Sequence, residues 1–288
     1  MHYKTRSTQG GTNSLNDQPK VSIITVCFNS AKTIRDTIES VINQTYGNIE
    51  YIIIDGGSTD GTLDIIREYE PYIAKWVSEP DEGIYDAMNK GIRMSTGEII
   101  GIINSDDYYA LDCITSVVHT IINDPKIDVV YGNLVICDEV GNLLYHIKSE
   151  VDMKKDLFKI MTVFHPTMFI KKLVYETEGL YNDKYLISAD YDLLFRVVRK
   201  NYRIKNLDKD LAFMRLGGIS TTNYYQAAKE NFHIRSENEI KILKNLLITL
   251  RGILGPLARK MLESIGLSCL IACYRKRKFG NIKYNYKL

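Results

Sequence analysis

Short apolar runs alternate with amphipathic stretches along the first third of the chain, and this rhythm predicts a layered α/β fold. Four continuous, β-branched runs are typical of strands buried on both faces of a parallel sheet: residues 21–27, 51–54, 73–77 and 98–103. Three stretches between them carry apolar side chains at helical spacing: residues 31–43, 62–69 and 84–94. Strands and helices that take turns in this way indicate βαβ units with right-handed crossovers.

The pattern is looser after residue 107. It predicts a helix over residues 111–122, strands over 128–135 and 143–148, and a helix over 190–200, and it favours helix from residue 223 onward. Residues 1–18 are rich in Thr, Ser, Gly and Asn, a composition typical of disorder. We therefore divide the chain into a disordered segment (1–18), an α/β domain (19–222) and a helical extension (223–288).

Charge is distributed unevenly, although the net charge of the chain is only +2. Residues 241–288 hold eleven of the 37 Lys and Arg but one of the 35 Asp and Glu. The acidic remainder needs a cation to hold a phosphate ligand, whereas the basic extension suits an anionic surface. Leucine-rich spacing over residues 244–258, followed by the basic run 275–278, predicts a helix that lies in a membrane interface. A helical hairpin packed on the domain, or a dimer contact, is the alternative.

Cysteine usage and hydropathy favour a cytoplasmic protein that is peripheral at the inner face of the cell membrane. The five cysteines are scattered without a CxxC pair, as expected for reduced thiols. The first twenty residues lack an apolar signal core, and no apolar run reaches the ~20 residues of a transmembrane helix. Nucleic-acid binding is disfavoured, because aromatic and basic residues are interleaved only within residues 279–286.

Two adjacent carboxylates, Asp106 and Asp107, follow the predicted strand at residues 98–103. Open α/β sheets bind their ligands where strands end, and two neighbouring like charges stay ionised when a cation lies beside them. Carboxylate oxygens favour Mg²⁺ or Mn²⁺, which commonly bridge to the phosphates of a substrate. The alternative is that one of the pair caps a helix that begins near Leu111.

Asp55 also ends a predicted strand, and it enters the Gly-rich turn at residues 56–61. A carboxylate in this position can accept hydrogen bonds from a nucleotide, and the glycines permit close approach of the backbone. The turn is neither a dinucleotide-binding GxGxxG, because the carboxylate precedes the glycines, nor a P-loop, because no GK[ST] follows. An ordinary strand–helix turn with Ser, Thr and Asp caps is the alternative.

Four segments, in this order, resemble the family 2 glycosyltransferases of the GT-A fold: PKVSIITVCFN (19–29), IIDGGSTDGT (53–62), EPDEGIYDAMNKG (79–91) and NSDD (104–107). Two later segments, HPTMF (165–169) and SADYD (188–192), match more weakly. The resemblance implies an α/β, Rossmann-like GT-A fold with a mostly parallel central sheet flanked by helices. It also implies metal-dependent, inverting transfer of a sugar from a nucleotide-diphosphate sugar, with UDP as the expected nucleotide, to a glycan or lipid-linked acceptor.

The resemblance also assigns roles to individual residues. Those expected at the nucleotide, its phosphates and the Mn²⁺ or Mg²⁺ ion are Thr25, Asn29, Asp55, Asp81, Lys90, Asp106, Asp107 and His165. Within this set, Asp107 is expected to coordinate the metal, Asp106 to lie against the ribose and the metal, and His165 to lie near the diphosphate or metal. Two alternatives stay open: a solvated helix face for Lys90 and a structural role for His165. Asn104 stands where many relatives carry an acid, which would leave fewer charges on the metal.

Inverting transfer needs a base that takes the proton of the acceptor hydroxyl on the face opposite the leaving diphosphate. Asp190 matches the family position of this base, and Asp192 is its competitor. Residues two apart on a helix do not share a face, so only one of the two is expected to point into the site. One of the pair could instead cap the helix that begins there. A nucleotidyltransferase and a non-catalytic nucleotide-sugar-binding protein are the alternative functions, although the first strand is not followed by the basic Gly-rich loop of the former.

Overall fold

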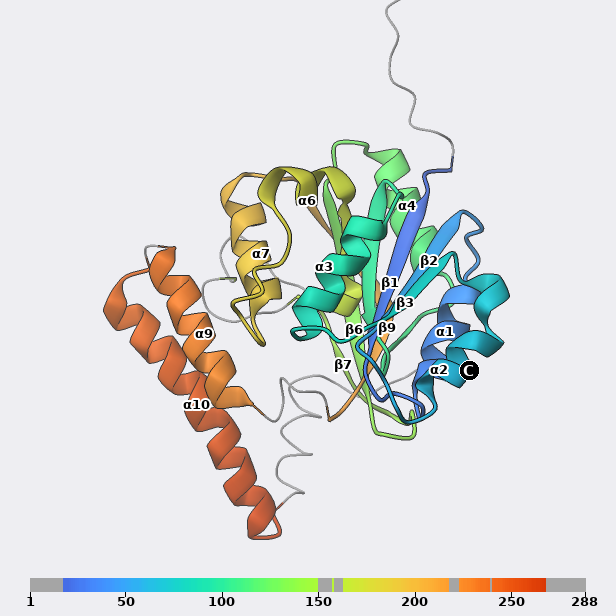
Figure 1. Cartoon of the computed structure of the whole chain (residues 1–288). Helices are drawn as coiled ribbons and strands as arrows, with labels where there is room; N and C mark the ends of the chain where they lie inside the picture. The colour runs from blue at the N-terminus through green and yellow to red at the C-terminus, as the bar shows by residue number, and fades with distance from the viewer. Residues whose placement is uncertain (1–17, 150–156, 158–162, 218–222, 239, 268–288) are drawn as a thin grey trace, which may run out of the picture.

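A mixed β-sheet forms the centre of the computed structural model, which describes residues 18–149, 157, 163–217, 223–238 and 240–267. Its strands are β1 (Val21–Cys27), β2 (Ile49–Asp55), β3 (Lys75–Ser78), β4 (Ile99–Asn104), β5 (Tyr108–Tyr109), β6 (Val129–Cys137), β7 (Leu143–Ile147), β8 (Phe169–Lys171) and β9 (Ile204–Arg215). They pair in the order β3-β2-β1-β4-β8-β6-β9-β5, and β7 pairs with β6 (Figure 1).

The helices follow the predicted alternation through β4. They are α1 (Ile34–Ile42), α2 (Thr62–Glu68), α3 (Ile84–Met94), α4 (Cys113–Asn123), α6 (Lys172–Glu178), α7 (Ala189–Arg199), α9 (Tyr224–Glu237) and α10 (Ile242–Ser264), with 3-10 turns η1 (Glu70–Tyr72) and η2 (His165–Thr167). The predicted disordered segment lies outside the described residues apart from Gln18. The division at residue 222 stays a prediction.

Strand direction decides which residues meet at one edge of the sheet. The strands β3, β2, β1 and β4 are mutually parallel. The next strand, β8, is antiparallel to both β4 and β6, and β6 and β9 are parallel to each other. Two antiparallel steps restore the direction, so the carboxyl ends of β1, β2, β4 and β9 all lie at one edge, which we call the carboxyl edge.

The sheet is curled, and this allows β4 and β5, which follow each other closely in the chain, to occupy distant places in the pairing order. Only residues 105–107 separate β4 from β5, yet β5 pairs with β9 at the end of the sheet. The pairing places Tyr108 opposite Phe213, and the two rings stack with their centroids 4.8 Å apart. The curl thereby brings the turn after β4 beside the end of β9.

Helices cover both faces of the sheet (Figure 1). Alternate residues of the strands point to opposite faces, so Ile24 and Ile100 pack with α3 and α7, whereas Ile23 and Ile103 pack with α1 and α4. Each such side chain stabilises the fold by roughly 1.5–3 kcal/mol when fully buried. A Cβ at Gly91 would lie 2.4 Å from Ile24 Cγ2, so α3 lies very close to β1.

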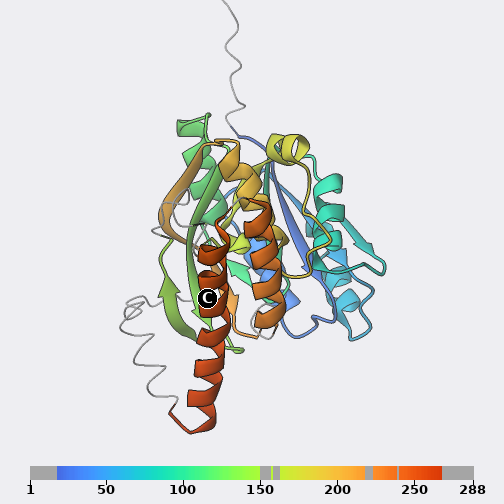
Figure 2. The ribbon, with the colours of Figure 1, turned by 90° about the vertical axis from the view of Figure 1, so that its left-hand side faces the viewer.

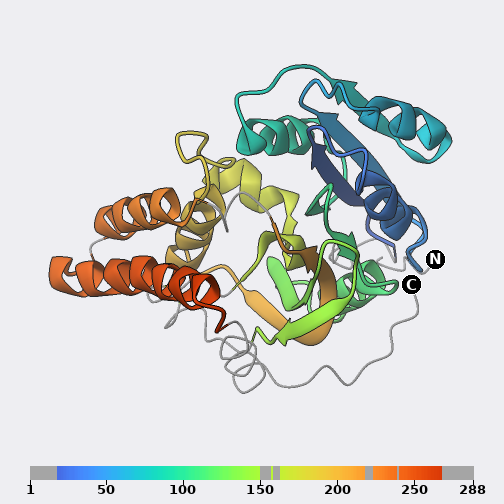
Figure 3. The same ribbon diagram turned by 90° about the horizontal axis from the view of Figure 1, so that it is seen from below.

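Helices α9 and α10 lie side by side and project from the α/β body (Figures 1, 2 and 3). Their shared interface contains the buried Arg235, whose Nε donates to Asn245 Oδ1 at 2.7 Å and whose Nη2 donates to Thr249 Oγ1 at 2.7 Å. In the described part of the chain, no helix combines the length and apolar character needed to cross a membrane. The prediction of a helical extension is confirmed for these two helices, and the basic run 275–278 lies outside the described residues.

Candidate functional site

The polar residues that the sequence singles out gather around the carboxyl edge. The loop after β1 and the turn after β4 meet there, because Ser30 Oγ and Ser105 Oγ are 2.7 Å apart and share a hydrogen bond. The same loop contacts the turn after β2, since the Ser30 N–H donates to Thr62 Oγ1 at 2.8 Å. Three strand ends distant in sequence therefore form one continuous surface.

Asp55 organises the turn after β2. Its fully buried carboxylate accepts the N–H groups of Gly57 at 3.0 Å and Ser58 at 2.9 Å, and the hydroxyl of Ser78 at 2.7 Å. Burial by itself would raise the pKa of Asp55, but these hydrogen bonds outweigh it and lower the pKa. Asp55 is therefore a carboxylate at neutral pH whose oxygens already hold the turn, and its contact with a nucleotide stays a prediction.

Asn29 and Thr25, both predicted at the nucleotide, occupy different depths. Asn29 adopts a left-handed backbone (φ 49°), which Asn tolerates better than most residues, and its Oδ1 accepts the N–H of Thr59 at 2.9 Å. It therefore joins the β1 loop to the Gly-rich turn at the surface. Thr25 is fully buried within β1, and its hydroxyl lies 3.0 Å from the Tyr51 hydroxyl. Its contact with a nucleotide likewise stays a prediction.

Asp81 and Phe28 both lie against the backbone of Gly56. A Cβ at Gly56 would be 2.4 Å from Asp81 Oδ2 and 3.5 Å from Phe28 Cδ2, so only glycine permits this approach. The Phe28 side chain is 62% exposed, although it follows a completely buried strand. An exposed ring beside a carboxylate offers a stacking surface and a hydrogen-bond acceptor to a flat heterocycle. Phe28 was not predicted as a site residue from the sequence. The feature that could have indicated it is a large apolar residue directly after the end of a buried strand.

Lys90 of α3 takes part in a local ion-pair network. Its ammonium is 3.0 Å from Glu79 Oε1 and 3.2 Å from Asp86 Oδ2, and it donates to the Pro80 carbonyl at 3.2 Å. These contacts attach the segment that carries Asp81 to α3. A contact between Lys90 and phosphates stays a prediction.

Asp107 is a buried carboxyl group, and one of its two oxygens accepts no hydrogen bond from a described residue. It is 1% exposed, its Oδ1 accepts the N–H of Arg215 at 3.2 Å, and its Oδ2 has no hydrogen-bond partner among the described residues. Burial, and after it the charge of Asp106, raise the pKa of Asp107 well above its ordinary value. Helix α4 has Asp112 at its N-cap, so the interpretation of Asp106 or Asp107 as its cap is wrong.

Arg215, at the end of β9, holds the turn that carries the two carboxylates. Its Nη1 donates to the Asp106 backbone carbonyl at 2.8 Å, and its Nη2 forms an ion pair with the Asp36 carboxylate. Its Cζ atom lies 5.2 Å from the centroid of the Tyr108 ring. Arg215 was not predicted as a site residue, because the hydrophobic pattern over residues 204–215 did not predict a strand. The guanidinium adds a buried positive charge to an otherwise acidic turn.

His165 lies in η2, which packs against β4 and β9. Burial lowers the pKa of His165 to about 4, so the imidazole is neutral at physiological pH, and its Nε2 has no hydrogen-bond partner among the described residues. Asn104 Oδ1, at the end of β4, is likewise buried and unpartnered there. Within the described ranges, no group of three or more His, Cys, Asp or Glu forms a metal site.

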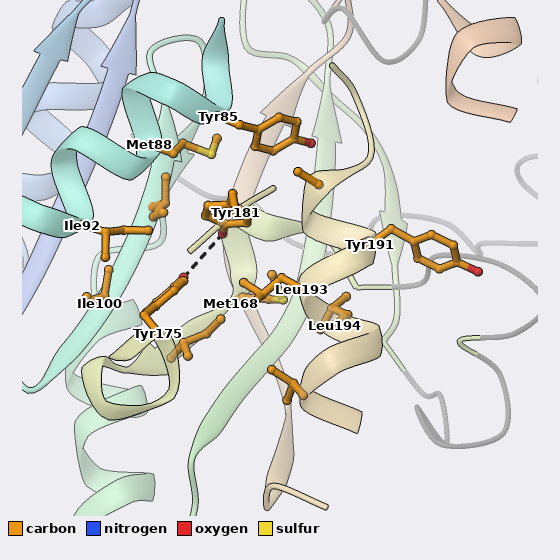
Figure 4. Close-up of a cluster of buried hydrophobic side chains, with 14 of the residues drawn as sticks. Tyr85, Met88, Ile92, Ile100, Met168, Tyr175, Tyr181, Tyr191, Leu193 and Leu194 are labelled. Atoms are coloured by element: carbon orange, nitrogen blue, oxygen red, sulfur yellow. Dashed lines mark hydrogen bonds between the residues drawn. The ribbon is translucent and has the colours of Figure 1, made fainter. Parts of the chain in front are cut away.

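Asp190 lies in the first turn of α7 and is 9% exposed. Its Oδ1 accepts the N–H of Tyr191 at 2.8 Å and lies 3.3 Å from the hydroxyl of Tyr85, which reaches across from α3 (Figure 4). Burial raises the pKa of Asp190 to about 6, which suits a base that works near neutral pH. Asp192 instead pairs with Arg196 at 3.0 Å. Ser188 is the N-cap of α7, so the interpretation of either aspartate as its cap is wrong.

Comparisons with known proteins agree on one family and one fold. Residues 22–178 match the family described as Glycosyl transferase family 2. A PGL/p-HBAD biosynthesis glycosyltransferase of Mycobacterium tuberculosis is 31% identical over 182 residues, which cover 62% of this chain and 69% of that protein. An uncharacterized glycosyltransferase of Rickettsia typhi is 32% identical over 190 residues, which cover 63% of this chain and 59% of that protein.

Solved structures of low sequence identity share the fold. TarS 1-349 of S. aureus in complex with UDP-GlcNAc superposes with a TM-score of 0.61 at 16% identity, over 81% of this chain and 71% of that one. In the comparison with another TarS structure, this chain spans 43% of the TarS chain. The mannosyltransferase PcManGT from Pyrobaculum calidifontis, in complex with GDP-Man and Mn²⁺, superposes with a TM-score of 0.60 at 19% identity, over 89% of this chain and 81% of that one.

Proposed function

Since the chain belongs to glycosyl transferase family 2 and is a glycosyltransferase with a GT-A fold, we propose that it transfers a sugar from a UDP-sugar by a metal-dependent, inverting displacement. The acceptor is a hydroxyl group of a glycan or of a lipid-linked molecule. The observation that carries the proposal is the buried Asp107 carboxyl, whose Oδ2 has no partner among the described residues, in the turn after β4 that Ser105 joins to the loop after β1.

The nucleotide lies on the surface formed by the ends of β1 and β2. Phe28 stacks on the base, and Asp81 accepts from it, because both groups flank the bare backbone of Gly56. Asn29 and Asp55 keep the two loops in place, and Lys90 fixes the segment that carries Asp81. Complexes of the structural relatives contain UDP, UDP-GlcNAc or GDP-Man, so GDP is the alternative nucleotide.

Mn²⁺ or Mg²⁺ fits the donor set at Asp107. A carboxyl that is buried beside a second carboxyl is costly to ionise unless a cation is present, and its unpartnered Oδ2 is a hard oxygen ligand. Asp106 would be a further protein ligand, with His165, whose 3-10 turn packs against β4, and Asn104, at the end of β4, as additional donors; the diphosphate would supply the remaining oxygens. When bound, the ion neutralises charge on the leaving diphosphate.

Asp190 accepts the proton of the acceptor hydroxyl as that oxygen attacks the anomeric carbon from the face opposite the diphosphate. Burial raises the pKa of Tyr85 well above its ordinary value, so the Tyr85 hydroxyl stays protonated. It donates to the Ile187 carbonyl at 2.6 Å, and its oxygen lies 3.3 Å from Asp190 Oδ1, so Tyr85 holds the peptide that leads to Asp190. Attack from the opposite face inverts the anomeric carbon.

Nucleotide binding tests the donor site. We expect UDP with Mn²⁺ to raise the melting temperature, because a UDP concentration one hundred times Kd stabilises the folded state by about 2.7 kcal/mol. UDP with EDTA should raise the melting temperature much less. GDP, dTDP and CDP serve as competitors. Gly56→Ala is expected to weaken UDP binding because its Cβ displaces Asp81, whereas Gly47→Ala, with nothing within 4 Å, is the matched control. Absence of a shift with all four nucleotides would contradict the donor site.

Helix α10 carries an apolar stripe that we assign to an anionic membrane surface, where a lipid-linked acceptor would be presented. Exposed side chains recur every three or four residues along it: Leu243, Leu247, Leu250, Leu254, Leu257 and Met261. Lys244 and Arg251 are exposed on the same helix, Lys241 is exposed directly before it, and the sequence continues into the basic run 275–278. The strongly basic composition of residues 241–288 favours an anionic membrane over a dimer contact.

Vesicle sedimentation tests this surface. We expect binding to vesicles that contain phosphatidylglycerol, weak binding to pure phosphatidylcholine, and a loss of roughly tenfold or more in Leu250→Glu, because one buried leucine contributes about 1.5–3 kcal/mol. Leu173→Glu, which changes an exposed leucine of α6, is the matched control. If Leu250→Glu and Leu173→Glu both bind like the wild type, the assignment is wrong; a dimer that only Leu250→Glu dissociates would favour the dimer contact.

A further inference from the structure

A buried carboxylate on α9 holds the segment that leads into α7. Glu230 is 6% exposed, and its two oxygens accept three consecutive backbone N–H groups: Leu186, Ile187 and Ser188, each at 3.0 Å. These residues are 42 to 44 positions away in the sequence. One side chain therefore attaches the C-terminal helical pair to the entrance of α7.

The three hydrogen bonds satisfy the N–H group of the N-cap residue of α7 and the two N–H groups before it. The first N–H groups of a helix and of the turn before it lack partners within the helix, and a side chain at the N-cap usually supplies one. Ser188 occupies the N-cap of α7 without a side-chain capping bond. Glu230 supplies acceptors from another helix instead, and its negative charge is favourable at a helix N-terminus.

The segment held by Glu230 also delivers Asp190. Ile187 donates its N–H to Glu230, and its carbonyl accepts the Tyr85 hydroxyl at 2.6 Å. That hydroxyl lies 3.3 Å from Asp190 Oδ1. The peptide just before Asp190 is thus fixed from α9 on one side and from α3 on the other, so a shift of Glu230 would move Asp190 relative to Tyr85.

We propose that Glu230 is a positioning residue of the transfer reaction: it holds residues 186–188 so that the Asp190 carboxylate faces the acceptor hydroxyl. This inference rests on the proposed role of Asp190 as the base. It also gives α9, which packs against α10, a direct connection to the reacting groups.

The charge of Glu230 affects the pKa of Asp190, and a measurement of this pKa distinguishes a positioning residue from one that only stabilises the fold. The charged or titratable groups that face Asp190 are Tyr85 of α3, Tyr181 before α7, and Glu230 of α9. Burial is the largest influence on the pKa of Asp190, and the charge of Glu230 raises it further. Neutralising Glu230 should therefore move the titration of Asp190 to lower pH, whereas loosening the segment alone would expose Asp190 without a fixed direction of change.

Glu230→Gln is the direct test, with Glu237→Gln as the matched control, because Glu237 lies on the same helix and accepts from Tyr185 in the neighbouring loop at 3.1 Å. The readouts are UDP release from UDP-glucose, UDP-galactose and UDP-GlcNAc with a membrane lipid extract as acceptor, the Kd for UDP with Mn²⁺, and the pKa of Asp190 from carboxyl ¹³C NMR. We expect Glu230→Gln to lower kcat roughly tenfold to a hundredfold with unchanged UDP affinity, and to lower the pKa of Asp190. Glu237→Gln should resemble the wild type.

Double variants separate this inference from the proposed function. In an Asp190→Asn background, Glu230→Gln should cause no further loss of activity, since it acts through Asp190. If Asp190→Asn is inactive while Glu230→Gln matches Glu237→Gln in kcat and in the Asp190 titration, the inference is overturned and the proposed base survives. If Asp190→Asn keeps full activity, the proposed base itself is wrong. Glu230→Asp, which keeps the charge, provides a second variant should Glu230→Gln fail to fold, and it should restore the titration of Asp190.

Discussion

Replacement of Asp190 by Asn is expected to lower the rate of sugar transfer by roughly 10²- to 10⁴-fold, with little change in the affinity for the nucleotide. Asn has nearly the same shape and can still accept the N–H of Tyr191, but it cannot take a proton from the acceptor hydroxyl. The measurement is release of UDP from a UDP-sugar, together with the Kd for UDP in the presence of Mn²⁺. Release of UDP, rather than pyrophosphate, also separates a glycosyltransferase from a nucleotidyltransferase.

Asp192→Asn is the matched control for this variant. It makes the same chemical change two residues along α7, where the carboxylate pairs with Arg196 and not with the site. We expect it to affect stability slightly and transfer little. Equal losses in the two variants would contradict the assignment of the base.

The pH profile of the wild type gives an independent check of Asp190. Because burial raises the pKa of Asp190 to about 6, the carboxylate form predominates above that pH and the protonated form below it. A base must be deprotonated to work, so kcat/KM should fall as the pH drops through about 6. Asp190→Asn should remove this acidic limb from the residual activity, and its persistence would point to another base.

Replacement of Asp107 by Asn is expected to lower transfer at least roughly 100-fold and to abolish the difference between UDP binding with Mn²⁺ and with EDTA. The Asp107 Oδ2 atom is buried without a partner among the described residues, so an uncharged amide there removes the strongest ligand available to the ion. Both effects are measured by the thermal-shift and UDP-release assays on the same preparation.

The stability of the metal-free protein distinguishes a ligand from a structural residue. The raised pKa of Asp107 means that, without a cation, its ionised form destabilises the fold, and this cost grows as the pH rises. Asp107→Asn should therefore leave the melting temperature in EDTA unchanged or higher at neutral pH. A marked loss of stability in EDTA together with normal Mn²⁺-dependent UDP binding would mean that Asp107 is structural.

Much of the first half of the fold could be predicted, because its signals are local. The runs that became β1, β2 and β4 are apolar on both faces; β2 and β4 end at the polar residues Asp55 and Asn104, and β1 ends two residues before Asn29. Strand β9 was missed because only its last third is well buried, and its polar first part contains Lys205, Asp208 and Lys209. Its partners β6 and β5 lie more than 65 residues away, a distance at which a local pattern carries no information.

The sequence by itself determined the alternation of β1 to β4 with their helices, the carboxylates at strand ends, and the chemistry that such groups support. These depend on hydrophobic periodicity and side-chain type, which are properties of neighbouring residues. Only the tertiary structure decided which carboxylates are available. Asp55 is engaged by its own turn and Asp192 by Arg196, whereas Asp107 and Asp190 are buried and form no ion pair with a described residue. Burial and long-range hydrogen bonds set the protonation and direction of a side chain, and both arise only when distant segments such as Glu230 and the entrance of α7 meet.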